Sequence, residues 1–132
     1  MPENPLDAIM YAWNNFSWSS DNDRIIIVIT DIYAHQSTDT SEGSCPGDNR
    51  CTISGEAVIN ELSGNGIIYA ISPDFTSILD DGFLDVRRLA DGLGEGRTTP
   101  LSNTGGKWYE YTNIPAVDLV SIGLVDEILE NY

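Results

Sequence analysis

The stretch RIIIVITDIYAH, residues 24–35, decides the fold that this sequence predicts. Its residues from Ile25 to Ile29 are all β-branched, and β-branched side chains favour β-strands. Because none of these five residues is polar, the run predicts a strand buried on both faces, as in a parallel sheet. Asp31 and His35, the chain's only histidine, follow the run. We therefore expect Asp31 at the carboxyl end of a buried strand, where α/β sheets usually bind ligands.

Helical and strand patterns alternate along the rest of the chain. Leu6, Ile9 and Trp13, for example, recur at the spacing of one helical face. The expected elements are, in order, a helix from Pro5 to about 16–19, a strand over 25–30, a helix over 55–63, a strand over 67–71, a small helix over 85–90, a strand over 107–111 and a helix from Pro115 to about 131. Such alternation implies a parallel sheet with right-handed crossovers and helices on both faces. The sequence therefore predicts an α/β fold, a three-layer Rossmann-like sheet, in a single domain over residues 1–132.

The charge balance is strongly acidic, with 21 Asp and Glu against six Lys and Arg, a formal net charge of −15. Phosphate backbones and anionic lipid surfaces both need a cationic footprint on the protein. The composition therefore argues against a nucleic-acid partner. No run of about 18 apolar residues is present to insert into a membrane. The acidity suits divalent cations or a basic partner, and its simplest interpretation is solubility.

Cys45 and Cys51 are the only cysteines, and they enclose the turn-rich segment Pro-Gly-Asp-Asn-Arg. A disulfide between them would favour an extracellular or cell-surface location. The amino terminus, however, lacks the basic and apolar regions of a signal peptide. Two free thiols in a loop are the alternative, and the lack of a second ligand pair argues against a zinc site.

Residues 36–54 are rich in Ser, Thr, Asp and Gly and predict a long loop. Loops of this length inside compact domains are usually functional or mobile. The acidic residues of this loop lack the alternating Asp/Asn spacing of an EF-hand calcium loop. Because the loop follows Asp31 on the expected ligand-binding rim, we expect it to contact a partner. The residues expected in this contact are His35, Asp39, Glu42 and Asp48.

Four segments together resemble successive parts of the C-terminal half of a von Willebrand factor type A domain. They read RIIIVITD, GEAVINELSGNGIIYAISPD, LADG and TGGKWYEY, and they are spread over nearly the whole chain. The resemblance implies a non-enzymatic protein-interaction or adhesion module. It also implies Mg²⁺ or Ca²⁺ bound in a metal-ion-dependent adhesion site, at which Asp31 matches the ligand that ends the Ile- and Val-rich strand.

The chain departs from the family pattern at the other metal ligands, because it contains no Asp-x-Ser-x-Ser segment. A hard divalent cation takes about six or more oxygen ligands, so Asp31 alone is expected to bind Mg²⁺ or Ca²⁺ weakly, in the millimolar range. The resemblance further implies that the family's N-terminal strands are missing. We therefore expect an exposed apolar sheet edge and either a homo-oligomer or a strand supplied in trans by a protein partner.

Two alternatives to the interaction module stay open. The first is a small metal-dependent hydrolase in which Asp31 and His35 form an acid–base pair. No recognisable motif places a nucleophile beside these two residues, which favours a structural or hydrogen-bonding histidine. The second alternative is a truncated fragment of a larger surface protein, which would expose apolar surface and self-associate.

Overall fold

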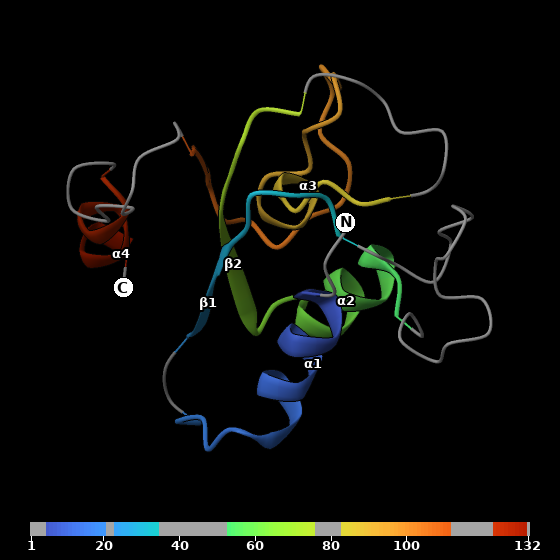
Figure 1. Cartoon of the computed structure of the whole chain (residues 1–132). Helices are drawn as coiled ribbons and strands as arrows, with labels where there is room; N and C mark the ends of the chain where they lie inside the picture. Colours follow the sequence, from blue (N-terminus) through green and yellow to red (C-terminus); the bar gives the residue numbers. More distant parts are fainter. Residues whose placement is uncertain (1–4, 21–22, 35–52, 76–82, 112–122, 132) are drawn as a thin grey trace.

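The computed structural model describes residues 5–20, 23–34, 53–75, 83–111 and 123–131. The elements are α1 (Pro5–Asn15), β1 (Arg24–Ile29), α2 (Gly55–Leu62), β2 (Gly66–Ser72), α3 (Arg87–Ala90), β3 (Trp108–Glu110) and α4 (Leu124–Asn131) (Figure 1). The three strands form one parallel sheet in the order β1-β2-β3. The chain therefore has the α/β, Rossmann-like architecture that the sequence predicts.

Local signals place the helix boundaries close to the predicted ones. At the start of α2, the Ser54 hydroxyl accepts a hydrogen bond from the backbone N–H of Ala57 at 3.1 Å, a standard N-cap. Gly64 follows the same helix with a φ of 78°, a conformation that glycine adopts without steric cost. The predicted final helix is described only from Leu124 onward, because residues 112–122 lie outside the described ranges.

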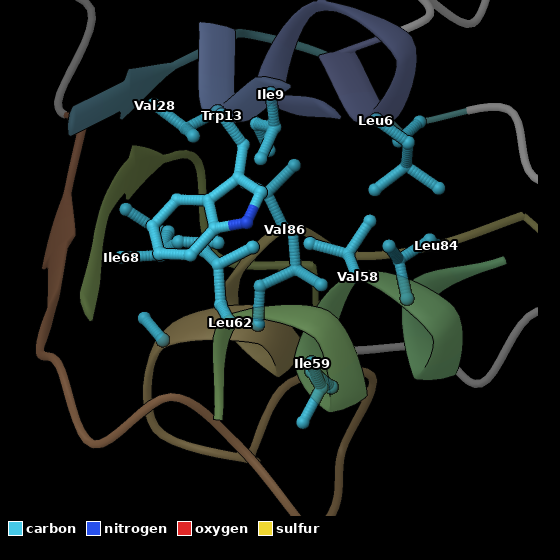
Figure 2. Packing of buried hydrophobic residues seen from close by; sticks show 14 residues of the cluster. Leu6, Ile9, Trp13, Val28, Val58, Ile59, Leu62, Ile68, Leu84 and Val86 are labelled. Atoms are coloured by element: carbon cyan, nitrogen blue, oxygen red, sulfur yellow. The ribbon is translucent and has the colours of Figure 1, made fainter. Parts of the chain in front are cut away.

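The first face of the sheet carries the larger core and packs against α1, α2 and α3 (Figure 1). Figure 2 shows Trp13 of α1 lying among side chains from the sheet and from α2. The buried members are Leu6, Ile9, Trp13, Val28, Ala34, Val58, Ile59, Leu62, Ile68, Ala70, Leu84, Val86, Leu89 and Ala90. Each fully buried aliphatic side chain of this kind contributes about 1.5–3 kcal/mol to folding, so this face supplies most of the driving force.

The second face of the sheet packs against α4 and forms a smaller cluster. Tyr69, Ile71 and Tyr109 of the sheet are buried against Leu124, and Ile128 packs at the margin. Helices thus cover both faces, and the fold has three layers. Among the described residues, no helix is long and apolar enough to cross a membrane.

The prediction that Ile25–Ile29 is buried on both faces is wrong, because β1 lies at the edge of the sheet. Val28 is buried on the first face, whereas the side chains of Ile27 and Ile29 on the second face are 39% and 52% exposed. The strand with both faces covered is β2, which lies between β1 and β3. A β-branched composition indicates that a segment prefers to form a strand. The position of the strand in the sheet determines how far its side chains are buried.

A tryptophan joins α1 to the beginning of the sheet. A Cβ atom at Gly66 would lie 2.7 Å from Cζ3 of Trp13, so the ring packs directly on the glycine backbone. The guanidinium of Arg24 lies 4.6 Å from the centroid of the Trp13 ring, within cation–π range. The positive charge of β1 is therefore turned toward α1, on the first face of the sheet.

Candidate functional site

A hollow of about 260 Å³ lies at the carboxyl end of the sheet. It is lined by Ile29, Thr30, Asp31 and Tyr111, which follow or end strands β1 and β3. We call it the Asp31 hollow. Its position agrees with the expectation from the sequence, since ligands of α/β folds bind beyond the carboxyl ends of the strands.

Thr30 builds the turn that presents Asp31. The backbone N–H of Thr30 donates to the carbonyl of Ile71 at 3.0 Å and so extends the pairing with β2 by one residue. Its hydroxyl accepts a hydrogen bond from the N–H of Ile32 at 3.3 Å and donates one to the carbonyl of Ile32 at 3.1 Å. The capping of the turn after β1 is therefore performed by Thr30 and not by the carboxylate of Asp31.

The Asp31 carboxylate is exposed and has no hydrogen-bond or ion-pair partner in the described part of the chain. On the far side of the hollow, the backbone N–H of Tyr111 donates to the carbonyl of Ser72 at 2.7 Å, which fixes the end of β3 against β2. The hollow thus combines one free carboxylate with the apolar side chain of Ile29 and an aromatic ring.

An aromatic pair lies on the segments that follow β1 and β2. The rings of Tyr33 and Phe75 are stacked, with centroids 4.0 Å apart and planes inclined by 29°. A short antiparallel bridge between Ala34 and Leu84 also ties down the segment after β1. These contacts give the chain leaving the Asp31 hollow a defined path.

The described residues around Asp31 do not fit a strong divalent-metal site. No three His, Cys, Asp or Glu side chains lie close enough together to hold a metal ion, as far as the described ranges extend. Asp31 offers a single carboxylate, and the neighbouring hydroxyl of Thr30 is already bonded to Ile32. Because Mg²⁺ and Ca²⁺ take about six or more oxygen ligands, weak binding at Asp31 stays a prediction.

The other site residues expected from the sequence lie outside the described residues, as does the predicted long loop except for its residues 53 and 54. These site residues are His35, Asp39, Glu42, Cys45, Asp48 and Cys51. Partner contact by this loop and the disulfide therefore also stay predictions.

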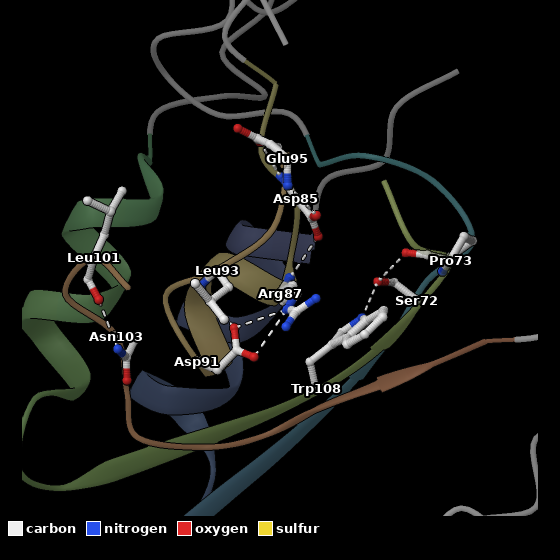
Figure 3. A network of polar contacts seen from close by, with 10 residues as sticks. All are labelled: Ser72, Pro73, Asp85, Arg87, Asp91, Leu93, Glu95, Leu101, Asn103 and Trp108. Atoms are coloured by element: carbon white, nitrogen blue, oxygen red, sulfur yellow. Dashed lines mark hydrogen bonds and ion pairs between the residues drawn. The ribbon is translucent and has the colours of Figure 1, made fainter. Parts of the chain in front are cut away.

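A buried pair of carboxylates, which the sequence did not reveal, lies beside α3 (Figure 3). The side chains of Asp85 and Glu95 are 1% and 5% exposed. Burial raises the pKa of Asp85 to about 6, against the opposing effect of hydrogen bonds from the backbone N–H groups of Arg87 and Glu95. A perturbed carboxyl of this kind is a common mark of active sites and also of structural networks.

The contacts of this pair identify it as a structural brace. The two oxygens of Asp85 accept hydrogen bonds from the backbone N–H groups of Arg87 and Glu95. The two oxygens of Glu95 accept from the backbone N–H of Asp85 and from the guanidinium of Arg97. All four oxygens accept a hydrogen bond within this loop, and both side chains are buried, which is the arrangement of a structural network. The signal that marks the brace is Gly94, where a Cβ would lie 2.5 Å from Oδ2 of Asp85.

Trp108 of β3 is held from two sides and offers no open aromatic platform. Its indole N–H donates to the hydroxyl of Ser72 at 3.0 Å, and the guanidinium of Arg87 lies 4.1 Å from its ring centroid (Figure 3). Arg87 is held in turn by the carboxylate of Asp91 at 3.1 Å. These contacts join α3 to the carboxyl half of the sheet.

Comparisons with known proteins do not assign the chain to a family. No protein-family model matches it, and neither the curated proteins nor the solved structures include a significant match.

Proposed function

We propose that this chain is a non-enzymatic protein-interaction module that contacts its partner at the Asp31 hollow. The observation that carries the proposal is the carboxylate of Asp31, to which no described residue is hydrogen-bonded or ion-paired. It is exposed at the carboxyl end of a parallel sheet, while Thr30 performs the structural capping. A carboxylate without a structural task beside Ile29 and Tyr111 suits the basic and apolar side chains of a protein partner.

A von Willebrand factor A-like origin belongs to the same proposal. The parallel order of the strands and the position of Asp31 directly after Thr30 support it. An adhesion role with an incomplete metal site, and a location at the cell surface, follow only if this origin is correct.

The test compares the proteins captured by the intact chain and by two groups of variants. Asp31→Asn and Tyr111→Ala alter the hollow, whereas Glu61→Gln alters an exposed carboxylate on α2. We expect one or more partners, quantified by mass spectrometry, to be retained by the intact chain and by Glu61→Gln but lost from both hollow variants.

The hydrolase alternative is tested on the same proteins with ester and phosphate-ester substrates in the presence of Mg²⁺. Turnover by the intact chain that disappears in both Asp31→Ala and His35→Ala would contradict the interaction module and support the hydrolase. An identical set of captured proteins for the hollow variants and for Glu61→Gln would also contradict the proposal.

A further inference from the structure

One edge of β1 is paired and the other is open within the described residues. The N–H of Thr30 bonds to Ile71 of β2. Backbone groups of successive strand residues point to alternate sides, so even-numbered residues of β1 face β2. The N–H and C=O groups of Ile25, Ile27 and Ile29 therefore point away from the sheet, and no described residue pairs with them.

The side chains along this open edge are apolar in the middle and acidic at both ends. Ile27 and Ile29 are 39% and 52% exposed, and the strand is flanked by the exposed residues Asp23 and Asp31. Arg24 does not neutralise these carboxylates in the plane of the edge, because its guanidinium lies over the ring of Trp13 on the first face of the sheet. The open edge is therefore a short row of apolar side chains with one negative charge at each end.

A second copy of this chain fits the edge poorly. A symmetric antiparallel pair centred on Ile27 would place Asp23 opposite the second copy's Asp31 at both ends. Like charges directly opposite each other destabilise a sheet. Registers shifted by two residues would instead bring an aspartate opposite an isoleucine. The net charge of −15 on each copy adds a general repulsion.

We propose that the open edge of β1 accepts an extended segment of a partner protein as an additional strand. The segment carries apolar residues opposite Ile25, Ile27 and Ile29 and a basic residue opposite each of Asp23 and Asp31. Main-chain hydrogen bonds supply the affinity in this mode, and the side chains supply the specificity. This inference rests on the proposed function, because it names the chemistry of the partner that the interaction module binds.

A designed peptide provides the probe. Positions 23 and 31 are eight residues apart, so the peptide Lys-Thr-Val-Thr-Val-Thr-Val-Thr-Lys places a lysine at each end of the edge and its valines beside the isoleucines. Calorimetric titration is expected to show binding. Hydrogen exchange followed by NMR is expected to show slowed exchange at the amides of Ile25, Ile27 and Ile29 in the presence of this peptide. A peptide with glutamates in place of both lysines should bind at least about tenfold more weakly, because it meets like charges at both ends.

Variants of the protein distinguish pairing of the peptide with the edge of β1 from nonspecific binding of the peptide. Ile27→Pro removes an edge-facing donor while leaving the hydrogen bonds to β2 intact, since proline is tolerated on such edges. We expect it to lose the peptide, whereas Ile27→Val binds as the intact chain does. Asp23→Asn and Asp31→Asn should each weaken the binding of the lysine peptide about two- to fivefold. Glu110→Gln, on the opposite edge strand, should leave binding unchanged.

Three results would overturn the inference. The first is no binding of the lysine peptide, and the second is equal binding by Ile27→Pro and Ile27→Val. The third is slow exchange at Ile25, Ile27 and Ile29 without peptide, which would mean that the edge is already paired. Light scattering would then distinguish pairing between two copies in a dimer from pairing within a monomer. If a partner captured by the intact chain depends on Asp31 and Tyr111 but survives Ile27→Pro, the edge inference fails while the proposed function stands.

Discussion

The backbone N–H of Asp85 donates a hydrogen bond to Oε1 of Glu95 at 3.0 Å, and the backbone N–H of Glu95 donates one to Oδ2 of Asp85 at 3.3 Å. This reciprocal pair closes the segment between the two residues, which contains α3, into a loop. Both side chains are buried, so the brace operates in a medium where an ionised carboxyl is costly.

The raised pKa of Asp85 predicts an unusual contribution to the pH dependence of stability. The carboxyl binds its proton more tightly when folded, with a pKa of about 6 against an ordinary value of 3.8. Its contribution to the free energy of unfolding is therefore fully present below pH 4 and is lost as the pH rises to about 6. By linkage the loss is about 3 kcal/mol.

Urea unfolding between pH 4 and 7 tests this expectation. Subtracting the curve of Asp85→Asn from that of the intact protein should leave a difference that falls with rising pH. A flat difference would show that the carboxyl titrates normally. The absolute stability of Asp85→Asn is not the readout, because the amide loses one of the two acceptors that Arg87 and Glu95 use.

Gly66→Ala is expected to destabilise the contact between α1 and the sheet. The new Cβ would lie 2.7 Å from Cζ3 of Trp13 and 3.1 Å from Cγ of Leu62, closer than packed atoms tolerate. Overpacking of this kind costs about 1–3 kcal/mol, measured as the change in the free energy of unfolding. The double variant Trp13→Phe Gly66→Ala should lose less than the sum of the two single changes, because the smaller ring leaves room for the methyl group.

Thr104→Val is expected to cost about 1–3 kcal/mol by leaving a buried donor unpaired. The Thr104 hydroxyl accepts a hydrogen bond from the N–H of Ile68 at 2.9 Å and donates one to the carbonyl of Leu89 at 2.8 Å. Valine keeps the shape but removes both bonds. Thr104→Ser retains the hydroxyl and should keep most of the stability in the same thermal or chemical unfolding experiment. A larger loss in Thr104→Ser than in Thr104→Val would contradict this expectation and assign the role of Thr104 to its methyl group.

Binding of Mg²⁺ or Ca²⁺ at Asp31 is expected in the millimolar range and is expected to vanish in Asp31→Asn. The physical reason is that one carboxylate supplies too few oxygens for a tight site. NMR titration should shift the amides of residues 30–32 in the intact protein and in Glu61→Gln. Micromolar affinity would indicate further ligands from elsewhere in the chain, and unchanged binding in Asp31→Asn would move the site away from the hollow.

Of the candidate site, only the position of Asp31 was predictable from the sequence. Asp31 follows a recognisable strand, and its place at the carboxyl end of the sheet follows from the strand's direction alone. The capping by Thr30 is a local contact with Ile32 that the sequence analysis did not anticipate. The position of Tyr111 across the hollow depends on the pairing of β3 with β2, which are far apart in the chain. The Asp85–Glu95 brace escaped prediction because its two residues come together only when a glycine-containing loop closes.

The sequence by itself determined which segments become helices and strands and that the sheet is parallel. These features depend on local signals: the period of apolar residues, the β-branched run at Ile25–Ile29, the Ser54 cap and the alternation of the two patterns. Only the tertiary structure decided which strand is central. The run Ile25–Ile29 has the more uniformly β-branched composition, yet β2 is the strand covered on both faces, because it lies at the centre of the sheet between the core under α1, α2 and α3 and the cluster under α4. Burial is set by neighbours in space, and the exposed edge of β1 follows from that order of strands.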